Sequence, residues 1–329
     1  MYPRNSINKS KNISRPFIHK KALLSGSWSD EDGVCTVKTI ELGDIPSFNL
    51  ERLEEKLSAQ DVVICNVETL NTHPHSPVFF KAAIKNKLID VKGINIVTGN
   101  GAIYELTTCA IKDAKINQCA KKVICGGAIF IYLSQTSNST SAPYDKYGSI
   151  VEHWTITKGK PMNVPKKTDH VYAMTEIHFP EIRILMRSEV DSKIDEELVE
   201  VKSRNHLRNN TASGFSRKAF RKAYLGGIEK MVFSGISPKD MEEAASNNRE
   251  FNPKMYCVHE VMQNDHYFNN NMYLARKICV KLLELFTCNP KAERIEIRKI
   301  KNIQEIIFAV FQDGQYVYSK MSTNILFSI

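Results

Sequence analysis

The chain has 329 residues, which is enough to bury the core of one large domain or two small ones. Its hydrophobic content of 42% and charged content of 25% are ordinary for a globular protein. No apolar run approaches the roughly 18 to 20 residues that a membrane-spanning helix needs, so we expect no membrane role. The net charge of +9 favours a polyanionic partner over an acidic substrate or a neutral ligand.

The first 21 residues are basic, rich in Asn and Ser, and lack the apolar centre of a secretory signal. We expect residues 1–21 to form a flexible basic arm and residues 22–329 to form a single domain. A nuclear-import role for the arm stays open. The eight cysteines contain no CxxC pair, and several lie in apolar segments. This usage predicts reduced thiols in an intracellular protein, either cytoplasmic or nuclear.

Apolar residues recur with helical spacing in some segments and alternate in others. The clearest helix is predicted over 271–287, and Asp313-Gly314 between two alternating segments predicts a hairpin. The other predicted helices cover 49–59, 102–112, 144–157 and 215–224, and the other predicted strands cover 62–67, 94–98, 123–133, 171–178 and 231–236. Because helices and strands do not alternate regularly, we predict an α+β fold, in which mixed sheets are flanked by helices and a cleft at the sheet holds the active site.

The stretch 181–202 carries the most informative residues. Alternating apolar side chains precede Glu189 and Asp191, and an apolar pair precedes Glu200 and Lys202. This pattern predicts two paired strands joined by a short polar turn. Side chains two apart on a strand share a face, so the paired faces would bring three carboxylates and one ammonium together. Mg²⁺ or Mn²⁺ would relieve the repulsion between those carboxylates, as in a metal-dependent nuclease. The alternative is a surface hairpin with solvated acids.

Two further features support a site for a polyanion. Glu152 lies on the flank of the apolar stripe of the helix predicted over 144–157, where it points either into a cleft or into solvent. A run of basic residues without any acid begins at the lysine of the acidic cluster, and we expect it to contact a phosphodiester strand; the alternative is a solvated charged face. The run comprises Lys202, Arg204, Arg208, Arg217, Lys218, Arg221 and Lys222.

These motifs resemble the active-site motifs of the DXO family of RNA 5′-end decapping enzymes and exoribonucleases. The Glu-x-Asp and Glu-x-Lys patterns at 189–191 and 200–202 carry the resemblance, and 148–152 is similar to the family's second motif. Further similar segments are 24–30, 96–98, 130–143 and 223–228. The resemblance covers most of the chain from about residue 22, at low overall similarity.

The resemblance implies cleavage of the phosphodiester after the first nucleotide of single-stranded RNA. Such cleavage would remove incomplete or unusual caps of the NAD, FAD or triphosphate type, with or without 5′-to-3′ degradation. It implies one or two Mg²⁺ or Mn²⁺ ions, a monomer, and a protein partner as an open question. The implied catalytic residues are Glu152, Glu189, Asp191, Glu200 and Lys202, with Glu152, Asp191, Glu200 and the Val201 carbonyl as metal ligands. The implied RNA-binding residues are Asn100, Arg204, Arg217, Lys218, Arg221 and Lys222.

Two positions depart from the family pattern. Asn100 stands where the family has an arginine, and Lys222 stands where it usually has a glutamine. Asn100 follows a strand and a glycine, but the segment lacks the third glycine and the lysine of a nucleotide-binding loop, so we predict a helix-capping asparagine. Two alternatives stay open: a catalytically weakened homologue that binds RNA 5′ ends or a protein partner, and a DNA-directed nuclease.

Overall fold

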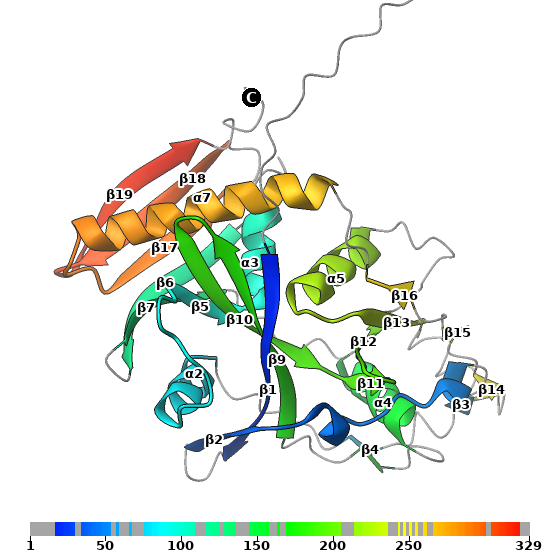
Figure 1. The fold of residues 1–329 in the computed structure, drawn as a ribbon. Coiled ribbons are helices and arrows are strands. Elements are labelled where there is room, and N and C mark those ends of the chain that lie inside the picture. The colour runs from blue at the N-terminus through cyan, green and yellow to red at the C-terminus, as the bar shows by residue number, and fades with distance from the viewer. Residues whose placement is uncertain are drawn as a thin grey trace, which may run out of the picture.

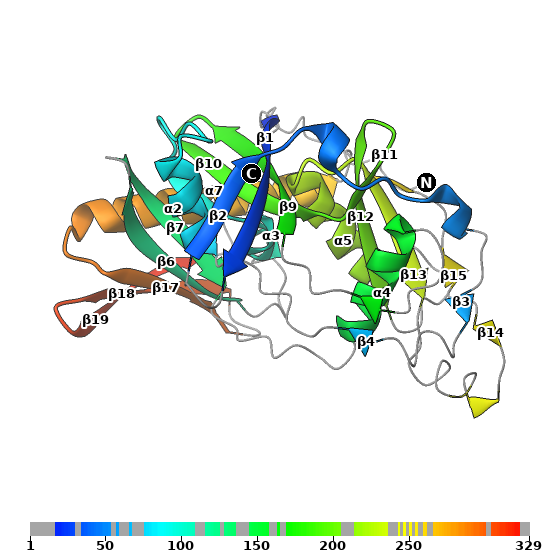
Figure 2. The same cartoon turned by 90° about the horizontal axis from the view of Figure 1, so that it is seen from below.

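The computed structural model describes residues 17–29, 34–53, 57–58, 66–67, 76–108, 116–125, 128–135, 145–157, 163–164, 169–204, 214–235, 243, 246–247, 250–251, 254–255, 259–261, 266–300 and 304–322. Within these residues the fold is α+β, as predicted, with one large and one smaller mixed sheet flanked by helices (Figures 1 and 2). No helix of the described chain is long and apolar enough to cross a membrane.

The large sheet has ten strands in the order β19-β18-β17-β6-β7-β5-β10-β9-β1-β2. Strand β5 runs parallel to both of its neighbours, and the other pairs are antiparallel. The strands are β1 (Phe17–Ser29), β2 (Val34–Thr39), β5 (Ile96–Gly99), β6 (Ile116–Cys125), β7 (Ala128–Gln135), β9 (Asp169–Phe179), β10 (Ile182–Val190), β17 (Arg294–Lys299), β18 (Glu305–Gln312) and β19 (Gln315–Ser322).

The smaller sheet begins where the chain leaves β10. It contains β11 (Ser192–Ile194), β12 (Glu197–Arg204), β13 (Lys230–Gly235), β15 (Lys254–Met255) and β16 (His259–Glu260). Strand β12 pairs antiparallel with β11 and parallel with β13. Two short pairs complete the described strands, one between β3 (Leu57–Ser58) and β14 (Glu250–Phe251) and one between β4 (Asn66–Val67) and β8 (Asn163–Val164).

Helices cover both faces of the large sheet. The long helix α7 (His266–Cys288) and α3 (Asn100–Thr107) bury their apolar faces against β5, β6, β10, β17 and β18, forming the largest core (Figure 1). Helix α2 (Ser76–Lys85) inserts Phe79 and Phe80 into a second core on the opposite face. Helix α5 (Gly214–Leu225) packs on β12 and β13, and α4 (Asp145–Ile156) also contacts β12. Two 3₁₀ turns, η1 (Leu42–Asp44) and η2 (Leu50–Leu53), follow β2.

The predicted elements agree with most of this fold. Helices α3, α4, α5 and α7 and strands β5, β9, β13, β18 and β19 lie where they were predicted, and the glycine-interrupted stretch 123–133 contains the ends of β6 and β7. The hairpin turn at Asp313-Gly314 has positive φ at both residues, as a two-residue hairpin connection requires. Four of the six residues predicted as a strand over 62–67 lie outside the described residues, and the other two form β4.

Two predictions differ from the structure, and some elements were not predicted. Of the helix predicted over 49–59, the described residues form the 3₁₀ turn η2 and the strand β3. Residues 17–21, predicted to belong to the arm, form the start of β1. Helix α2 and strand β17 were not predicted, although Phe79, Phe80, Ala83 and Ile84 in α2 have the spacing of one helical face.

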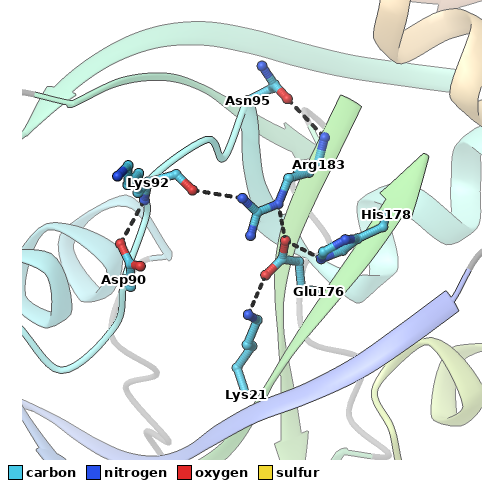
Figure 3. A network of polar contacts seen from close by, with 7 residues as sticks. All are labelled: Lys21, Asp90, Lys92, Asn95, Glu176, His178 and Arg183. Atoms are coloured by element: carbon cyan, nitrogen blue, oxygen red, sulfur yellow. Dashed lines mark hydrogen bonds and ion pairs between the residues drawn. The ribbon is translucent and has the colours of Figure 1, made fainter. Parts of the chain in front are cut away.

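A buried carboxylate joins four segments at the end of β9 away from the acidic residues (Figure 3). The Glu176 side chain is fully buried, and its Oε1 accepts from Arg183 Nε at 2.5 Å. Lys21 Nζ lies 2.9 Å from Oε2, and His178 Nε2 lies 2.5 Å from Oε1. Arg183 also donates to the Lys92 carbonyl at 2.9 Å. The network therefore ties β1, β9 and β10 to the connection between α2 and β5.

Candidate active site

The acidic residues meet where the chain passes from the large sheet to the small one. Strand β10 pairs with β5 and β9, whereas β12 pairs with β11 and β13, so the predicted direct pairing of these two strands is wrong. The hairpin joins β11 to β12 instead, through a tight turn with Asp195 at φ 53°. Asp191 lies at the crossing point between the sheets. The site is therefore assembled from two sheets, which is why β-periodicity alone could not specify its geometry.

Glu189 is oriented by a histidine from the neighbouring strand. It lies near the end of β10, opposite Tyr172 of β9, and its Oε1 is 3.0 Å from His170 Nδ1. The His170 side chain is fully buried, whereas that of Glu189 is partly exposed. A buried imidazole that contacts one carboxylate oxygen restricts the rotamers of Glu189. Sequence reasoning missed His170, because its position beside Glu189 depends on the pairing of β9 with β10.

Asp191 is held against β12 by the backbone. Its Oδ2 accepts a hydrogen bond from the Val201 N–H at 2.8 Å. The Asp191 N–H donates to the Val199 carbonyl at 3.3 Å. Both contacts join the end of β10 to the strand that carries Glu200 and Lys202. Val201 was predicted as a ligand through its carbonyl, and in the structure its N–H positions Asp191.

Glu200 and Lys202 form an ion pair on one face of β12. Burial raises the pKa of Glu200 to about 7, with the Asp191 and Glu189 carboxylates adding to the rise and Lys202 opposing it. Burial disfavours the charge of Lys202, but Glu200, Asp191 and Glu152 outweigh burial and raise the pKa of the ammonium. The charge of Lys202 is therefore stabilised by carboxylates from three elements.

Glu152 reaches this cluster from α4. Ile150, Val151 and Trp154 bury one side of the helix, and Glu152 is half-buried on its flank, as the helical spacing predicts. Its carboxylate is close enough to raise the pKa of Lys202. Of the two alternatives for Glu152, the structure therefore favours the one in which it faces the cluster.

In this structure the acidic cluster does not present a complete set of metal ligands. Within the described part of the chain, no three His, Cys, Asp or Glu side chains converge closely enough to hold an ion. Glu200 contacts Lys202, and one oxygen of Asp191 contacts the Val201 N–H. The donor set still fits a hard divalent cation, because it is made of carboxylates whose mutual repulsion helps to raise the pKa of Glu200.

Asn100 and Lys222 link two helices beside the cluster. Gly99 occupies the N-cap of α3 without a side-chain capping bond, so the prediction of Asn100 as the cap is wrong. Asn100 Nδ2 instead donates to the Lys222 carbonyl at 3.0 Å, and the same carbonyl accepts from the Gly226 N–H at 3.0 Å. Burial, Lys218 and Lys202 lower the pKa of Lys222, while Glu200 opposes them. The Lys222 ammonium therefore lies within the electrostatic reach of the cluster.

The other predicted RNA-binding residues lie along β12 and α5. Lys218 is exposed, and its Nζ lies 5.8 Å from the centroid of the Tyr104 ring. Arg221 is half-buried on α5. Arg204 ends β12 and Arg217 lies in the first turn of α5, but their side chains are outside the described part of the structure. The structure thus places six of the seven basic residues of the run on β12 and α5, which flank the carboxylates, and Arg208 lies outside the described residues.

Arg187 is a further charged residue at this end of β10 that sequence reasoning missed. Its guanidinium lies 4.6 Å from the Tyr172 ring centroid and 5.0 Å from that of Phe79. Burial lowers its pKa, whereas Tyr172, Tyr132 and Glu189 oppose the shift. The signal was present in the sequence, because Arg187 and Glu189 are two apart on a strand and share a face.

Comparison with known proteins identifies solved structures that share the fold of this chain. Neither known protein-family profiles nor curated protein sequences match the chain. Solved structures of Dxo1 and Rai1 proteins do match it, over nearly its whole length. At identities of 10–14% these matches establish a shared fold. The chain therefore has the fold of the Dxo1 and Rai1 structures.

Three of these structures carry ligands. K. lactis Dxo1 in complex with manganese has a TM-score of 0.59 at 12% identity, covering 93% of this chain and 94% of that one. S. pombe Rai1 in complex with 3′-FADP has a TM-score of 0.60 at 11% identity, covering 93% and 95%. Candida albicans Rai1 in complex with pU5 and Mn²⁺ has a TM-score of 0.51 at 12% identity, covering 99% and 94%.

Proposed function

We propose that this chain is a divergent member of the DXO family and a metal-dependent hydrolase of RNA 5′ ends. The observation that carries the proposal is the cluster of Asp191, Glu200 and Lys202 at the junction of two sheets, joined electrostatically by Glu189 and Glu152. The same fold is found in Dxo1 and Rai1 structures that bind manganese or nucleotides. Fold and cluster together support a phosphodiesterase more strongly than either does alone.

Glu152, Asp191 and Glu200, with the Val201 carbonyl, are the residues that would hold one or two Mg²⁺ or Mn²⁺ ions. Such an ion would supply Lewis-acid activation of water and neutralise charge on the phosphate. Holding it requires Glu200 to exchange its contact with Lys202 for the ion. Glu189, oriented by His170, would be the fourth carboxylate of the site.

Lys202 would contact the scissile phosphate. Its charge is stabilised by Glu200, Asp191 and Glu152, so it stays protonated across the neutral range and donates hydrogen bonds to non-bridging phosphate oxygens. In the hydrolysis, the oxygen of water bonds to phosphorus, the phosphorus–oxygen ester bond breaks, and a proton from water goes to the leaving oxygen. Lys202 stabilises the charge that grows on the phosphate during this exchange.

The proposed substrate is single-stranded RNA, cleaved after its first nucleotide. The C. albicans Rai1 structure holds pU5, and the S. pombe structure holds 3′-FADP. The 3′-FADP ligand supports caps of the FAD type as substrates for this chain, and the pU5 ligand supports a single-stranded RNA 5′ end. Caps of the NAD type and triphosphate ends are proposed on the resemblance to the DXO family. Lys222, Lys218 and Arg221 on α5 would follow the RNA backbone as point charges, which does not require a particular sequence.

A second candidate function is binding of RNA 5′ ends without cleavage. It is favoured by Asn100, which contributes a helix-to-helix hydrogen bond where the family has a cation. It is also favoured by the Glu200–Lys202 pair, which uses a carboxylate that the metal would need. The presence of all four carboxylates and the lysine argues against binding without cleavage. A protein that only binds an anionic RNA end does not require a cluster of acidic residues.

One assay separates the two candidates. Purified protein is incubated with 5′-triphosphate, NAD-capped and FAD-capped RNAs and with Mg²⁺ or Mn²⁺, beside a Glu200→Ala, Lys202→Ala double variant. A Glu197→Ala, Lys230→Ala double variant is the matched control, because it removes an ion pair from the other end of β12. We expect product from the wild type and the control and none from the site variant. No product from any RNA, with equal RNA binding by wild type and site variant, would leave only the binding function.

A further inference from the structure

The outer end of the large sheet carries an aromatic and basic surface away from the acidic cluster. Register places Arg294, Glu296 and Arg298 of β17 on the same face as Tyr316 and Tyr318 of β19. Helix α7 packs against the other face, through Ile295, Ile297 and Phe308 (Figure 2). We call this surface the outer sheet face, and it comprises Lys121, Arg294, Glu296, Arg298, Phe311, Tyr316, Tyr318 and Lys320.

The aromatic rings of the outer sheet face are fixed in position. The Arg294 guanidinium lies 4.0 Å from the Phe311 ring centroid and 5.7 Å from that of Tyr316. Arg294 donates to the Tyr316 hydroxyl at 2.9 Å, and this hydroxyl donates to Glu296 Oε1 at 2.6 Å. Tyr318 is stacked beside Tyr316, with centroids 6.2 Å apart and planes at 23°. Rings held in this way lose little freedom when a flat ligand stacks on them.

Exposure and charge show what kind of ligand this surface suits. Tyr318 is 63% exposed, Tyr316 is 37% exposed and Arg298 has half of its side chain exposed. Four cations on the face exceed its two acids, Glu296 and the neighbouring Glu305. Arg294 and Arg298 contact Glu296, and Lys320 Nζ lies 3.2 Å from Glu305 Oε2, so the face keeps a net positive charge. Exposed aromatic rings between arginines and lysines are the combination that holds single-stranded nucleic acid, by base stacking and backbone attraction.

The outer sheet face lies on the same side of the sheet as Glu189. Lys320 lies opposite Ile307, which lies opposite Arg298. A parallel row crosses the whole sheet to β10 and runs through Tyr316, Phe311, Arg294, Lys121, Tyr132, Val97 and Leu185. Leu185 shares a face of β10 with Glu189, and helix α2 packs over the Tyr132, Val97 and Leu185 part of this row. Six strand spacings separate β19 from β10, which amounts to roughly 30 Å along a twisted surface. A stacked strand at about 3.4 Å per nucleotide would need about nine nucleotides to cover that distance.

We infer that the outer sheet face is a second RNA-contact surface, which binds single-stranded RNA several nucleotides away from the end held at the acidic cluster. Bases stack on Tyr318 and Tyr316, and Arg298 and Lys320 attract the neighbouring phosphates. The inference rests on the proposed function for its ligand. A second copy of the chain pairing with the edge strand β19 is the competing occupant, and it is distinguished by experiment.

The test compares RNA binding at two lengths. Equilibrium affinity is measured for a 5′-phosphorylated trinucleotide and for a single strand of about 20 nucleotides. The variants are Tyr318→Ser and Arg298→Ala, and Val317→Ser is the matched control, because Val317 is half-exposed on the opposite face of the same strand. Circular dichroism and thermal unfolding check that each variant is folded, and sedimentation velocity gives its oligomeric state.

We expect Tyr318→Ser to weaken binding of the long RNA about tenfold and to leave trinucleotide binding unchanged. Arg298→Ala is expected to lower the slope of log affinity against log salt by about 0.7 for the long RNA alone. Val317→Ser should match the wild type throughout. Equal long-RNA binding by all variants overturns the inference, as does a Tyr318→Ser variant whose only change is loss of a dimer.

The test is independent of catalysis. If no RNA is cleaved but Tyr318→Ser still weakens long-RNA binding, the second contact surface stands and the hydrolase proposal fails. If short capped RNA is cleaved normally by a Tyr318→Ser variant that binds long RNA as the wild type does, the hydrolase proposal stands and the second contact surface fails.

Discussion

Asn100 and Lys222, the two residues that depart from the family pattern, are in direct contact with each other. The Asn100 amide donates to the carbonyl of Lys222, and that carbonyl also receives the Gly226 N–H that ends α5. An arginine at position 100 would bring a cation to the RNA but could not reproduce this short amide contact from the same backbone position. In the proposed RNA site, the absence of a cation at position 100 is therefore coupled to a hydrogen bond that fixes the backbone of Lys222, which carries a different cation.

This coupling predicts distinct outcomes for two substitutions of Asn100. Both Asn100→Ala and Asn100→Arg remove the bond to Lys222 and should lower the free energy of unfolding by about 1 kcal/mol. Only the arginine adds a cation, so Asn100→Arg should bind RNA more tightly than Asn100→Ala does. Urea unfolding and RNA affinity at fixed salt measure the two effects.

Asn95→Ala is the matched control for Asn100. The Asn95 side chain accepts from the Arg183 N–H at 2.9 Å, a side-chain-to-backbone bond remote from the acidic cluster. The Asn95→Ala variant should lose a similar amount of free energy of unfolding without any change in RNA affinity. If the arginine and alanine variants at position 100 bind RNA equally, a cation at this position has no contact with the substrate.

At the scale of elements, the Glu176 network holds β1, β9, β10 and the α2–β5 connection together (Figure 3). Burial acts to raise the pKa of Glu176, but hydrogen bonds from Arg183 and Lys21 and the charge of His178 outweigh it and lower the pKa. A folded-state pKa below the unfolded value means that ionised Glu176 stabilises the fold. That stability is fully present above the ordinary pKa of 4.5 and is lost as the pH falls through the lower folded value.

Glu176→Gln tests this linkage. The neutral amide should lower the free energy of unfolding at pH 7 by roughly 2 kcal/mol, because charged partners lose a charged acceptor. It should also flatten the decline in stability below pH 4.5, since no carboxylate remains there to protonate. Urea midpoints between pH 7 and pH 3 measure both effects. Glu284→Gln, on an exposed ion pair of α7, should leave the pH profile as in the wild type, and an equal flattening in both variants would contradict the linkage.

At the scale of the whole molecule, periodicity predicted the elements well where one face is buried. Helix α7 and strand β9 are long, and their apolar patterns are regular. Segment 49–59 has leucines at helical spacing, but its described residues form a 3₁₀ turn at 50–53 and the strand β3 at 57–58. Arg52 in this turn is buried, and its guanidinium lies 5.2 Å from the Trp154 ring. Tertiary contact thus overrode local spacing in that segment.

The site was predictable in its residues but not in its construction. Side chains two apart on one strand share a face by geometry alone, so Glu200 and Lys202 could be paired from the sequence. Strand order depends on contacts distant in sequence, so neither the position of His170 beside Glu189 nor the separation of β10 and β12 into two sheets could be predicted. Asn100 was misassigned for the same reason, because its partner lies 122 residues away.

Metal binding offers a whole-molecule test of the proposed site that needs no substrate. An ion that binds the folded chain at 100 times its dissociation constant stabilises it by about 2.7 kcal/mol, which raises the melting temperature of a chain of this size by roughly 5 °C. We expect Mn²⁺ to produce such a rise and excess chelator to reverse it. Asp191→Asn and Glu200→Gln should abolish the rise, because each removes a proposed ligand, whereas Glu197→Gln at the start of β12 should retain it. A rise of equal size in the Asp191 variant would mean that the ion binds elsewhere on the chain.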